Sequence, residues 1–453
     1  MRTTREFILK KPQEFKEKLL EWSRQFEEIA WLDSNEYDQS QSDFDAVLAV
    51  QAFTVLKTDF HNGFSKLHEY QEVTKDWIFG YLSYDLKNDV EQLSSRNYDN
   101  LHFPDLYFFQ PARIIQLKGE TAVFRYLKMV DDEMEADFEE IIRYEIGEVR
   151  PETKDVRPET KEERENRKEI IENRQKKEAI TARISRDQYL KKVNEMLSHI
   201  HRGDIYEANF CQEFFAENRT IEPFEIFKNL NEISIPPFAV FLKFESNYLM
   251  CASPERYLKK FGNKILSQPI KGTAKRAENP EDDLKIALEL SRDPKERSEN
   301  VMIVDLVRND LSKVAKKGSV KVEELCRVYS FKQVHQMIST VSAELETGIP
   351  PVEVLRATFP MGSMTGAPKI SAMKIIEALE ETKRGLYSGA VGYFTPEGDF
   401  DFNVVIRSIL YNSERKYVSF SVGGAITSKS VPEKEYEECL LKSEAMRQAL
   451  IQN

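Results

Sequence analysis

Lys271 lies in a short stretch whose neighbours constrain its backbone. The stretch reads Ser267-Gln268-Pro269-Ile270-Lys271-Gly272-Thr273. Proline fixes its own φ angle, and glycine permits conformations that a side chain forbids. A lysine held in a pocket can lose its proton and act as a nucleophile or base, whereas a lysine in an open turn is only solvated. On its own, the stretch favours the solvated turn, because perturbed groups are the minority.

Three glutamates offer ligands for a divalent cation. Glu435 and Glu438 lie three residues apart on a predicted C-terminal helix, and Lys442 follows four residues later, so the three share one helix face. Glu299 lies on a separate helical pattern. Brought together, these carboxylates supply the oxygen ligands that Mg²⁺ uses while it keeps waters and substrate. Spacing alone favours an ordinary salt bridge between residues four apart.

Two glycine-rich turns are candidate anion sites. Residues 361–369 carry Gly362 and Gly366 ahead of a predicted helix, and Gly423 and Gly424 follow a predicted strand. Exposed backbone N–H groups at such turns suit a carboxylate. Glycine serves a tight turn equally well, so the alternative is purely structural. Neither turn matches a nucleotide-binding fingerprint.

Glu255 is a candidate acid. It lies in Ser253-Pro254-Glu255-Arg256, one predicted hairpin before Lys271, so the two side chains are expected to face each other. A carboxylic acid beside a neutral lysine would make a general acid and nucleophile pair. A hairpin salt bridge is the simpler alternative.

Composition excludes several classes of protein. The net charge of −12 argues against a general nucleic-acid binder. The six histidines are scattered and the four cysteines are far apart, so zinc and disulfide chemistry are not expected. Residues 1–7 lack the apolar core of a signal peptide, and no apolar run approaches the ~20 residues of a membrane span. We expect a cytoplasmic protein with free thiols in a reducing compartment.

The elements that must position these residues indicate an α+β fold. Helical periodicity covers residues 12–30, 185–203, 279–308, 351–358, 368–380 and 433–452, and strand-like runs arrive in hairpin-like groups between them. We predict large, mainly antiparallel sheets packed as a sandwich, with helices on the outer faces. Residues 1–132 form an N-terminal α/β part, and residues 184–453 form the catalytic domain.

Residues 133–183 separate these two parts. They are dense in both charges, and Arg150-Pro151-Glu152-Thr153-Lys154 recurs as Arg157-Pro158-Glu159-Thr160-Lys161. We interpret them as a solvated linker, partly helical after Glu162; a partner-binding segment is the less favoured alternative.

Together these stretches resemble the chorismate-utilising enzymes, which include anthranilate, aminodeoxychorismate, isochorismate and salicylate synthases. The resemblance runs from about residue 185 to the end, in the order found in that family, and includes Trp31-Leu32-Asp33-Ser34 near the start. The matching pieces of the C-terminal part are residues 253–256, 268–276, 297–310, 359–369, 387–393, 406–408, 422–426 and 435–442.

Lys271 indicates the branch of the family. Pro-Ile-Lys-Gly-Thr is similar to aminodeoxychorismate synthases, component I, whereas anthranilate synthases typically carry alanine at the lysine position. The resemblance implies conversion of chorismate and ammonia to 4-amino-4-deoxychorismate, for para-aminobenzoate and folate synthesis. It also implies that a separate glutamine amidotransferase subunit delivers the ammonia.

The resemblance implies a role for each candidate residue. Lys271 would add at C2 of the ring, Glu255 would protonate the leaving C4 hydroxyl, and Thr273 would help to position the ring. To attack, Lys271 must be uncharged, which we expect burial and nearby cations to favour. Glu299 and Glu438 would hold Mg²⁺, with Glu435 near the metal. The implied substrate-binding residues are Arg407, Lys442, Tyr387, Thr365, Gly366, Gly423, Gly424 and Gln336.

Three positions depart from the family pattern. A histidine of the family falls on Gln336, with His335 one residue early. Glu207 stands where the two amino-transferring branches usually have glutamine and isochorismate synthases have a base lysine, and Ala425 replaces a third glycine. The enzyme alternative is anthranilate synthase component I, and the non-enzyme alternative is a chorismate-binding protein without turnover. A tryptophan pocket near Ser34 is a further possibility that the resemblance raises.

Overall fold

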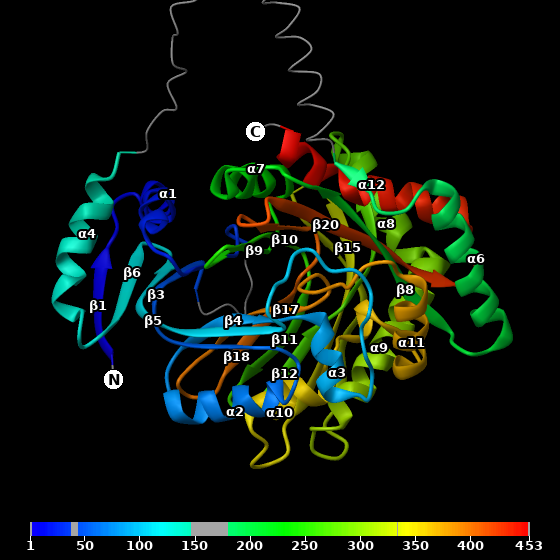
Figure 1. Ribbon diagram of the computed structural model, residues 1–453, viewed down its shortest axis with the longest axis horizontal. Helices are drawn as coiled ribbons and strands as arrows, with labels where there is room; N and C mark the ends of the chain where they lie inside the picture. Colours follow the sequence, from blue (N-terminus) through cyan, green and yellow to red (C-terminus); the bar gives the residue numbers. More distant parts are fainter. Residues whose placement is uncertain (1, 38–43, 146–179, 333, 452–453) are drawn as a thin grey trace, which may run out of the picture.

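The computed structural model describes residues 2–37, 44–145, 180–332 and 334–451. Its centre is an antiparallel β-sandwich covered by helices on both outer faces (Figure 1). The expected α+β class and antiparallel architecture are confirmed. In the described part of the chain, no helix is both long and apolar enough to cross a membrane.

The first layer of the sandwich follows one unbroken series of antiparallel pairs. The order is β3, β2, β9, β10, β19, β20, β8, and β8 also pairs with two short strands, β7 and β16. The bounds are β2 Ile29–Asp33, β3 Ala46–Thr58, β7 Thr181–Ala182, β8 Glu207–Ala216, β9 Phe238–Phe244, β10 Asn247–Ser253, β16 Gly366–Ala367, β19 Ser408–Asn412 and β20 Tyr417–Thr427.

The second layer is joined to the first by the long pair β3–β5. From β5 the order is β4, β17, β18, β11, β12, β15, and β15 also carries β13 and β14. The strands β6 and β1 extend β5 at its other half. The bounds are β1 Arg2–Ile8, β4 Ile78–Leu82, β5 Leu106–Lys118, β6 Thr121–Leu127, β11 Arg256–Phe261, β12 Lys264–Gln268, β13 Ile270–Lys275, β14 Lys321–Ser330, β15 Val334–Glu344, β17 Ala390–Phe394 and β18 Phe400–Val404.

Three apolar cores explain the layering, because alternate residues of each strand face opposite sides. The sandwich interior is formed by side chains such as Ala30, Val240 and Tyr393. Their strand neighbours, such as Trp31 and Phe241, pack against the helices α1, α4, α6, α7, α11 and α12 on one outer face. On the other outer face, strand residues such as Leu258 pack against α2, α9 and α10. Figure 1 shows α7 and α12 above the sheets and α2 and α10 below them.

The helices begin and end where caps and prolines dictate. Their bounds are α1 Pro12–Trp22, α2 Gly63–Thr74, α3 Lys87–Val90, α4 Met134–Arg143, α6 Arg186–Arg202, α7 Pro223–Ser234, α8 Pro280–Arg292, α9 Pro294–Ser312, α10 Pro351–Thr358, α11 Lys369–Leu379 and α12 Pro432–Ile451. Ser185 caps α6 with a reciprocal capping box, as its position before the apolar pattern indicates.

Two predicted helices differ from those observed. The pattern over residues 12–30 ends as an α-helix at Trp22, because the chain turns and enters β2 at Ile29. The pattern over residues 279–308 is two helices, since Pro294 lacks the N–H that a continuous helix needs. Asp293 caps the second helix by accepting hydrogen bonds from the backbone of Lys295 at 2.8 Å and Glu296 at 2.9 Å.

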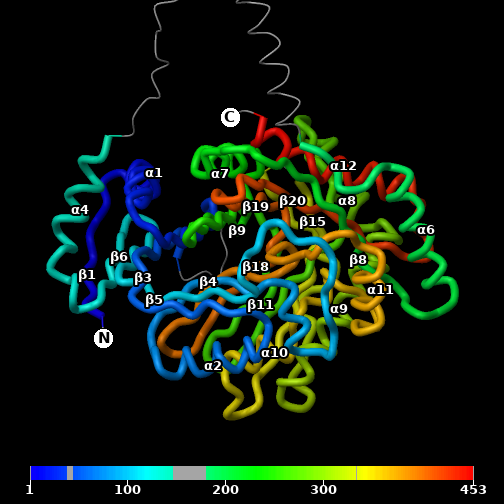
Figure 2. Tube along the Cα trace, in the orientation of Figure 1, coloured from blue at the N-terminus to red at the C-terminus, as the bar shows by residue number. Residues whose placement is uncertain are grey.

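The N-terminal part pairs directly with the rest of the chain in both layers. β2 pairs with β9 and β4 pairs with β17, so the early strands continue both series of late strands (Figure 2). The predicted linker, residues 133–183, begins with α4, whose Met134 and Ile141 are buried. The repeated pentapeptide and the region after Glu162 lie outside the described residues.

Candidate active site

Lys271 is placed by β13, which runs along β15 with a register shift between Ile270 and Thr273. The sequence favoured a turn here, but the residue lies in a strand. Gly272 has φ +89°, and an added Cβ would meet the Glu296 side chain at 3.2 Å. The glycine therefore lets β13 lie against α9, which brings Lys271 next to that helix.

Carboxylates surround Lys271. Its positive charge acts on five glutamates that come from β8, the start of β11, α9 and α12: Glu207, Glu255, Glu296, Glu299 and Glu438. Strand pairing brings these segments together. The spacing of residues along the sequence did not reveal this grouping.

Glu255 is a buried acid. Its side chain is 4% exposed. Burial raises the pKa of Glu255 to about 7, although a hydrogen bond from Ser363 and the charge of Lys271 act in the opposite direction. A carboxylic acid with this pKa holds its proton near neutral pH and can donate it to a leaving group. Lys271 acts electrostatically on Glu255, in keeping with a site that both residues share.

Glu299 on α9 and Glu435 and Glu438 on α12 all act on the charge of Lys295. Burial raises the pKa of Glu299 to about 7, and its Oε1 is buried without a hydrogen-bond partner in the described part of the chain. Burial also raises the pKa of Glu435. Burial pushes the pKa of Glu438 upward too, but Lys442, at 2.6 Å, lowers it overall.

The same cluster holds a lysine that the sequence did not single out. Lys295 Nζ lies 3.8 Å from Glu299 Oε1. Burial lowers the pKa of Lys295, but the negative charges of Glu299, Glu435, Glu296 and Glu438 together raise it. Lys295 and Glu296 lie four and three residues before Glu299, so helical spacing was the signal that could have found them.

These carboxylates fit an oxygen-coordinated divalent cation. Among the described residues, no three acidic, histidine or cysteine side chains are arranged to hold a metal ion. Glu299 Oε1 is nevertheless buried without a hydrogen-bond partner in the described part of the chain, and Glu435 and Glu438 act with it on the charge of Lys295. Such an open set of hard oxygen ligands suits Mg²⁺, which keeps several waters and takes oxygens from a substrate.

Positively charged side chains and a glycine pair lie beside the glutamates. Arg407 has φ +53° between β18 and β19, and in the described residues no hydrogen bond or ion pair engages its guanidinium. Burial lowers the pKa of Arg407, while Tyr387 and Glu438 oppose that change. Lys442 donates to the carbonyl of Gly423 at 3.1 Å. A Cβ added at Gly424 would lie 3.4 Å from Glu435 Oε2 and 3.9 Å from Lys442 Nζ, so this glycine borders the cluster.

Thr365, Thr273 and Gln336 are described by their contacts with neighbouring parts of the fold. Thr365 donates its hydroxyl to Met361 and Gly362 carbonyls at 3.2 Å each, and thereby orders its own loop. Thr273 is exposed and lies opposite the buried Gln336 in the β13–β15 register.

His335 lies beside Gln336 but turns to the other side of β15. Its ring contacts Asp283 at 2.9 Å and Ser330 at 2.8 Å. Arg276 and His335 hold the pKa of Asp283 well below its usual range, with the Arg276 hydrogen bond the larger influence. His335 therefore does not take the role of the family histidine, whose position is Gln336. Through Asp283, His335 joins β15 to α8.

Arg384 is a positioning residue that the sequence did not reveal. It is 5% exposed and forms an ion pair with Glu380 at 2.7 Å. It also donates to the carbonyls of Met364 at 2.6 Å and Asn209 at 2.8 Å. One guanidinium thus joins the glycine-rich turn to β8, next to Glu207.

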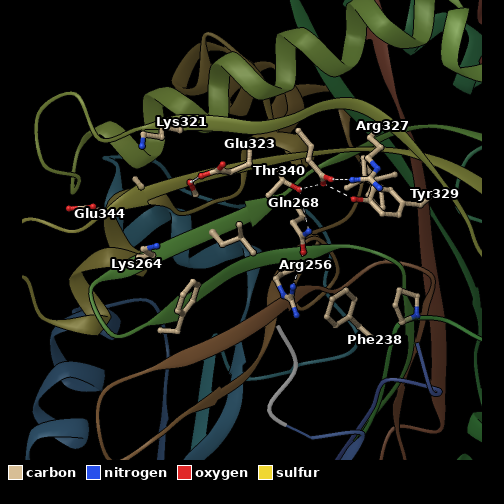
Figure 3. Close-up of a pocket in the computed structure, with 18 of the residues that line it drawn as sticks. Phe238, Arg256, Lys264, Gln268, Lys321, Glu323, Arg327, Tyr329, Thr340 and Glu344 are labelled. Carbon is tan, nitrogen blue, oxygen red and sulfur yellow. Dashed lines mark hydrogen bonds and ion pairs between the residues drawn. The ribbon is translucent and has the colours of Figure 1, made fainter. Parts of the chain in front are cut away.

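A separate cleft of about 1140 Å³ opens on the other side of these strands (Figure 3). Arg256, Gln268, Arg327 and Tyr329 line it, and Glu324 accepts a hydrogen bond from Tyr329 at 2.6 Å. Because strand neighbours point to opposite faces, Glu255 and Lys271 face away from this cleft. Near Ser34 a much smaller cavity of about 40 Å³ is present, which is too small for a tryptophan side chain in this conformation.

A match to a protein-family model shows the family to which the chain belongs. The model of the chorismate binding enzymes matches residues 16–448. The chain belongs to this family. The crystal structure of anthranilate synthase component I from Streptococcus pneumoniae has the same fold, with a TM-score of 0.71 and 23% identity over 88% of this chain and 91% of that one.

Three curated relatives illustrate the sequence similarity within the family. Aminodeoxychorismate synthase component 1 from Bacillus subtilis is 33% identical over 86% of this chain and 81% of its own length. Anthranilate synthase component 1 from Thermus thermophilus is 34% identical over 82% and 77%. The chloroplastic aminodeoxychorismate synthase of Arabidopsis thaliana is 41% identical over 61% of this chain, which spans only 30% of that longer protein.

Proposed function

We propose that the chain is the chorismate-aminating component of an aminodeoxychorismate synthase. The observation that carries the proposal is the position of Lys271 among buried carboxylates, with Glu255 protonated near neutral pH beside it. A nucleophile and an acid on one small site suit displacement of a hydroxyl from a ring. The similarity to relatives of that name supports the choice of chorismate and ammonia as substrates.

The proposed reaction begins with substrate binding. Arg407, Lys442, Tyr387 and the amides of Gly423 and Gly424 hold the two carboxylates of chorismate, with Gly366 completing the wall beside Thr365. When bound, Mg²⁺ supplies positive charge against a ring carboxylate, and Glu299, Glu438 and Glu435 would hold it. A dianionic ligand needs such fixed positive charge inside an acidic protein.

Lys271 and Glu255 then perform the exchange at the ring. Lys271 Nζ forms a bond to C2 while the two conjugated ring double bonds shift and the C4 hydroxyl leaves as water with the proton of Glu255. Ammonia next bonds to C4, both double bonds shift back, and the C2–N bond breaks to free the lysine. Thr273, backed by Gln336, borders the ring during both steps. The product is 4-amino-4-deoxychorismate, a precursor of para-aminobenzoate and folate.

We also propose that the ammonia comes from a separate glutamine amidotransferase subunit, in a reducing cytoplasm where the four buried cysteines stay free thiols. The name component 1, carried by the Bacillus subtilis relative, supports a partner subunit. The sequence of this chain contains no segment that we can assign to that activity.

Product analysis tests the proposal. The purified chain is incubated with chorismate, Mg²⁺ and ammonium chloride, and products are separated by liquid chromatography with mass and fluorescence detection. We expect 4-amino-4-deoxychorismate from the wild type and from Lys275→Ala, a matched exposed lysine on the same strand, and none from Lys271→Ala. Fluorescent anthranilate would instead support the anthranilate synthase alternative, and binding of chorismate without product would support a silent binding protein.

A further inference from the structure

Ser330, His335 and Asp283 form a continuous chain of hydrogen bonds outside the glutamate cluster. The Ser330 hydroxyl lies 2.8 Å from His335 Nδ1, and His335 Nε2 lies 2.9 Å from a carboxylate oxygen of Asp283. His335 is 1% exposed, whereas Ser330, at the outer end of the chain, is exposed. The three residues come from β14, β15 and α8, so no local sequence motif joins them.

The strand register brings the serine and the histidine together. Phe331 donates its backbone N–H to the carbonyl of Val334 at 2.8 Å, and Ser330 is the next residue, directly opposite His335. Hydrogen-bonded and non-hydrogen-bonded pairs alternate in an antiparallel ladder, and the side chains of a non-hydrogen-bonded pair lie closer together. Ser330 and His335 are therefore such a close pair, and the amide N–H of Ser330 points away from β15.

Asp283 sets the tautomer of the imidazole. An ionised carboxylate only accepts hydrogen bonds, so the proton of neutral His335 lies on Nε2 and the lone pair of Nδ1 faces Ser330. Arg276 keeps Asp283 ionised. Its Nε donates to the carboxylate at 2.9 Å, and this hydrogen bond holds the pKa of Asp283 well below its usual range. The serine hydroxyl thus donates to a base that a third group orients.

These are the parts of a serine nucleophile and its general base. Such groups are recognised by geometry rather than by their order in the chain: a hydroxyl lies within about 2.6–3.2 Å of a base, and a third group orients that base. In serine proteases the Nε2 atom of the histidine faces the serine, whereas here it is Nδ1. Either nitrogen can take the proton when the other one already carries its own.

The surroundings of Ser330 suit a small ester. Ser330, Phe331 and Tyr37 line the cleft of about 1140 Å³, next to Tyr329, which Figure 3 labels at one end of it. The rings of Phe331 and Tyr37 pack edge to face with centroids 5.2 Å apart, and they offer an apolar surface to an aryl or short alkyl group. The outward N–H of Ser330 is a donor for the acyl oxygen, which gains negative charge in the transition state.

We propose that Ser330 and His335 catalyse acyl transfer from small activated carboxylic esters to water, with Asp283 as the positioning residue. The proton of the Ser330 hydroxyl passes to His335 Nδ1 while Oγ bonds to the acyl carbon and an electron pair of the carbonyl moves onto its oxygen. That pair returns, the ester C–O bond breaks, and the alcohol leaves with the proton from Nδ1. Water repeats both steps at the acyl-serine, which yields a carboxylic acid and free Ser330.

A fluorophosphonate probe tests for the activated serine, because it forms a phosphorus–oxygen bond with such a hydroxyl and releases fluoride. The purified full chain is treated with the probe, and the modified residue is identified by peptide mass spectrometry. We expect labelling at Ser330, loss of this label in Ser330→Ala, and labelling at least about 100-fold slower in His335→Gln, the lower range for loss of a general base. Ser342→Ala is the matched control, since Ser342 on β15 donates to Glu323 at 2.6 Å and not to a histidine. This variant should be labelled like the wild type.

Hydrolysis of p-nitrophenyl acetate measures turnover. The wild type should release p-nitrophenol and carry an acetyl group on Ser330 during the reaction, which mass spectrometry of the quenched protein detects. Ser330→Ala should lose both signals. Asp283→Asn should slow the release, because an amide no longer fixes the imidazole tautomer, and Asp283→Glu should restore part of the rate, which a purely structural role would not predict.

Several results would overturn the role of Ser330. They are labelling of Ser330 no faster than that of Ser342, labelling at the wild-type rate in folded His335→Gln, and ester hydrolysis unchanged in Ser330→Ala. Because Ser330 is exposed, its alanine variant should fold and decides the question if the variants at the buried His335 do not. Amination of chorismate should be unchanged in Ser330→Ala, so the two activities stand or fall separately.

Discussion

Two adjacent glycines of β20 should respond very differently to the same substitution. A Cβ at Gly423 would lie 2.3 Å from Cys211 Sγ and 2.6 Å from the Phe210 carbonyl oxygen, so the pairing of β8 with β20 must shift. A Cβ at Gly424 meets its nearest neighbour, Glu435 Oε2, at 3.4 Å, which is ordinary contact. We therefore expect Gly423→Ala to lower the free energy of unfolding by about 1–3 kcal/mol, as overpacking does.

Gly424→Ala should fold normally and bind poorly. Its free energy of unfolding should stay within about 1 kcal/mol of the wild type, because no neighbour has to move. The new methyl group lies among Glu435, Lys442 and Glu438, where the proposed substrate carboxylate and the cation shell meet. Loss of one polar contact there costs about 1.4 kcal/mol, so chorismate affinity should fall about tenfold.

Denaturant unfolding and calorimetric titration with chorismate and Mg²⁺ measure both quantities on the same samples. The opposite pattern, with Gly424→Ala binding like wild type and Gly423→Ala as stable as wild type, would refute the placement of this turn. Wild-type affinity in Gly424→Ala by itself would show that the substrate does not reach the turn.

The remaining predictions concern the charges of the site. With the pKa of Glu255 near 7, amination should fall about tenfold per pH unit above that value, and Glu255→Gln should lose about 100-fold at neutral pH. The folded state holds this proton between pH 4.5 and 7 while the unfolded state releases it, so the free energy of unfolding should decrease as pH rises through that window, by about 3 kcal/mol from this group. Glu299→Gln should weaken Mn²⁺ binding, measured by electron paramagnetic resonance, at least about tenfold; unchanged binding would remove Glu299 from the metal site. Arg407→Leu should raise the dissociation constant for chorismate about 100-fold, as expected for an unpaired buried charge, and an unchanged titration would exclude that contact.

Local patterns predicted much of this fold because they report on single elements. The face shared by Glu435, Glu438 and Lys442 follows from helical spacing, and α10 begins and ends where its proline and apolar pattern indicate. Pairing between distant strands is not written in local periodicity. For that reason the sequence favoured a turn at Lys271, although β15 holds it in a strand.

The candidate site was predicted unevenly for the same physical reason. Residues in a recognisable motif, such as Glu255 and Glu299, could be named as candidates from the sequence. The grouping of the carboxylates on which Lys271 acts could not be predicted, because it depends on which segments meet. Arg384 gave no motif at all, since its partners are backbone carbonyls of two separate segments.

The pairing of early with late strands bears on how the polypeptide holds together. Because β2 pairs with β9 and β4 pairs with β17, the hydrogen-bonded ladders cross the boundary that the charged region suggests. Two separately expressed pieces, 1–145 and 180–453, would each bear an unpaired strand edge that only the other completes. Co-expression should thus yield a nicked complex that co-purifies and melts in one cooperative transition, while either piece alone should aggregate.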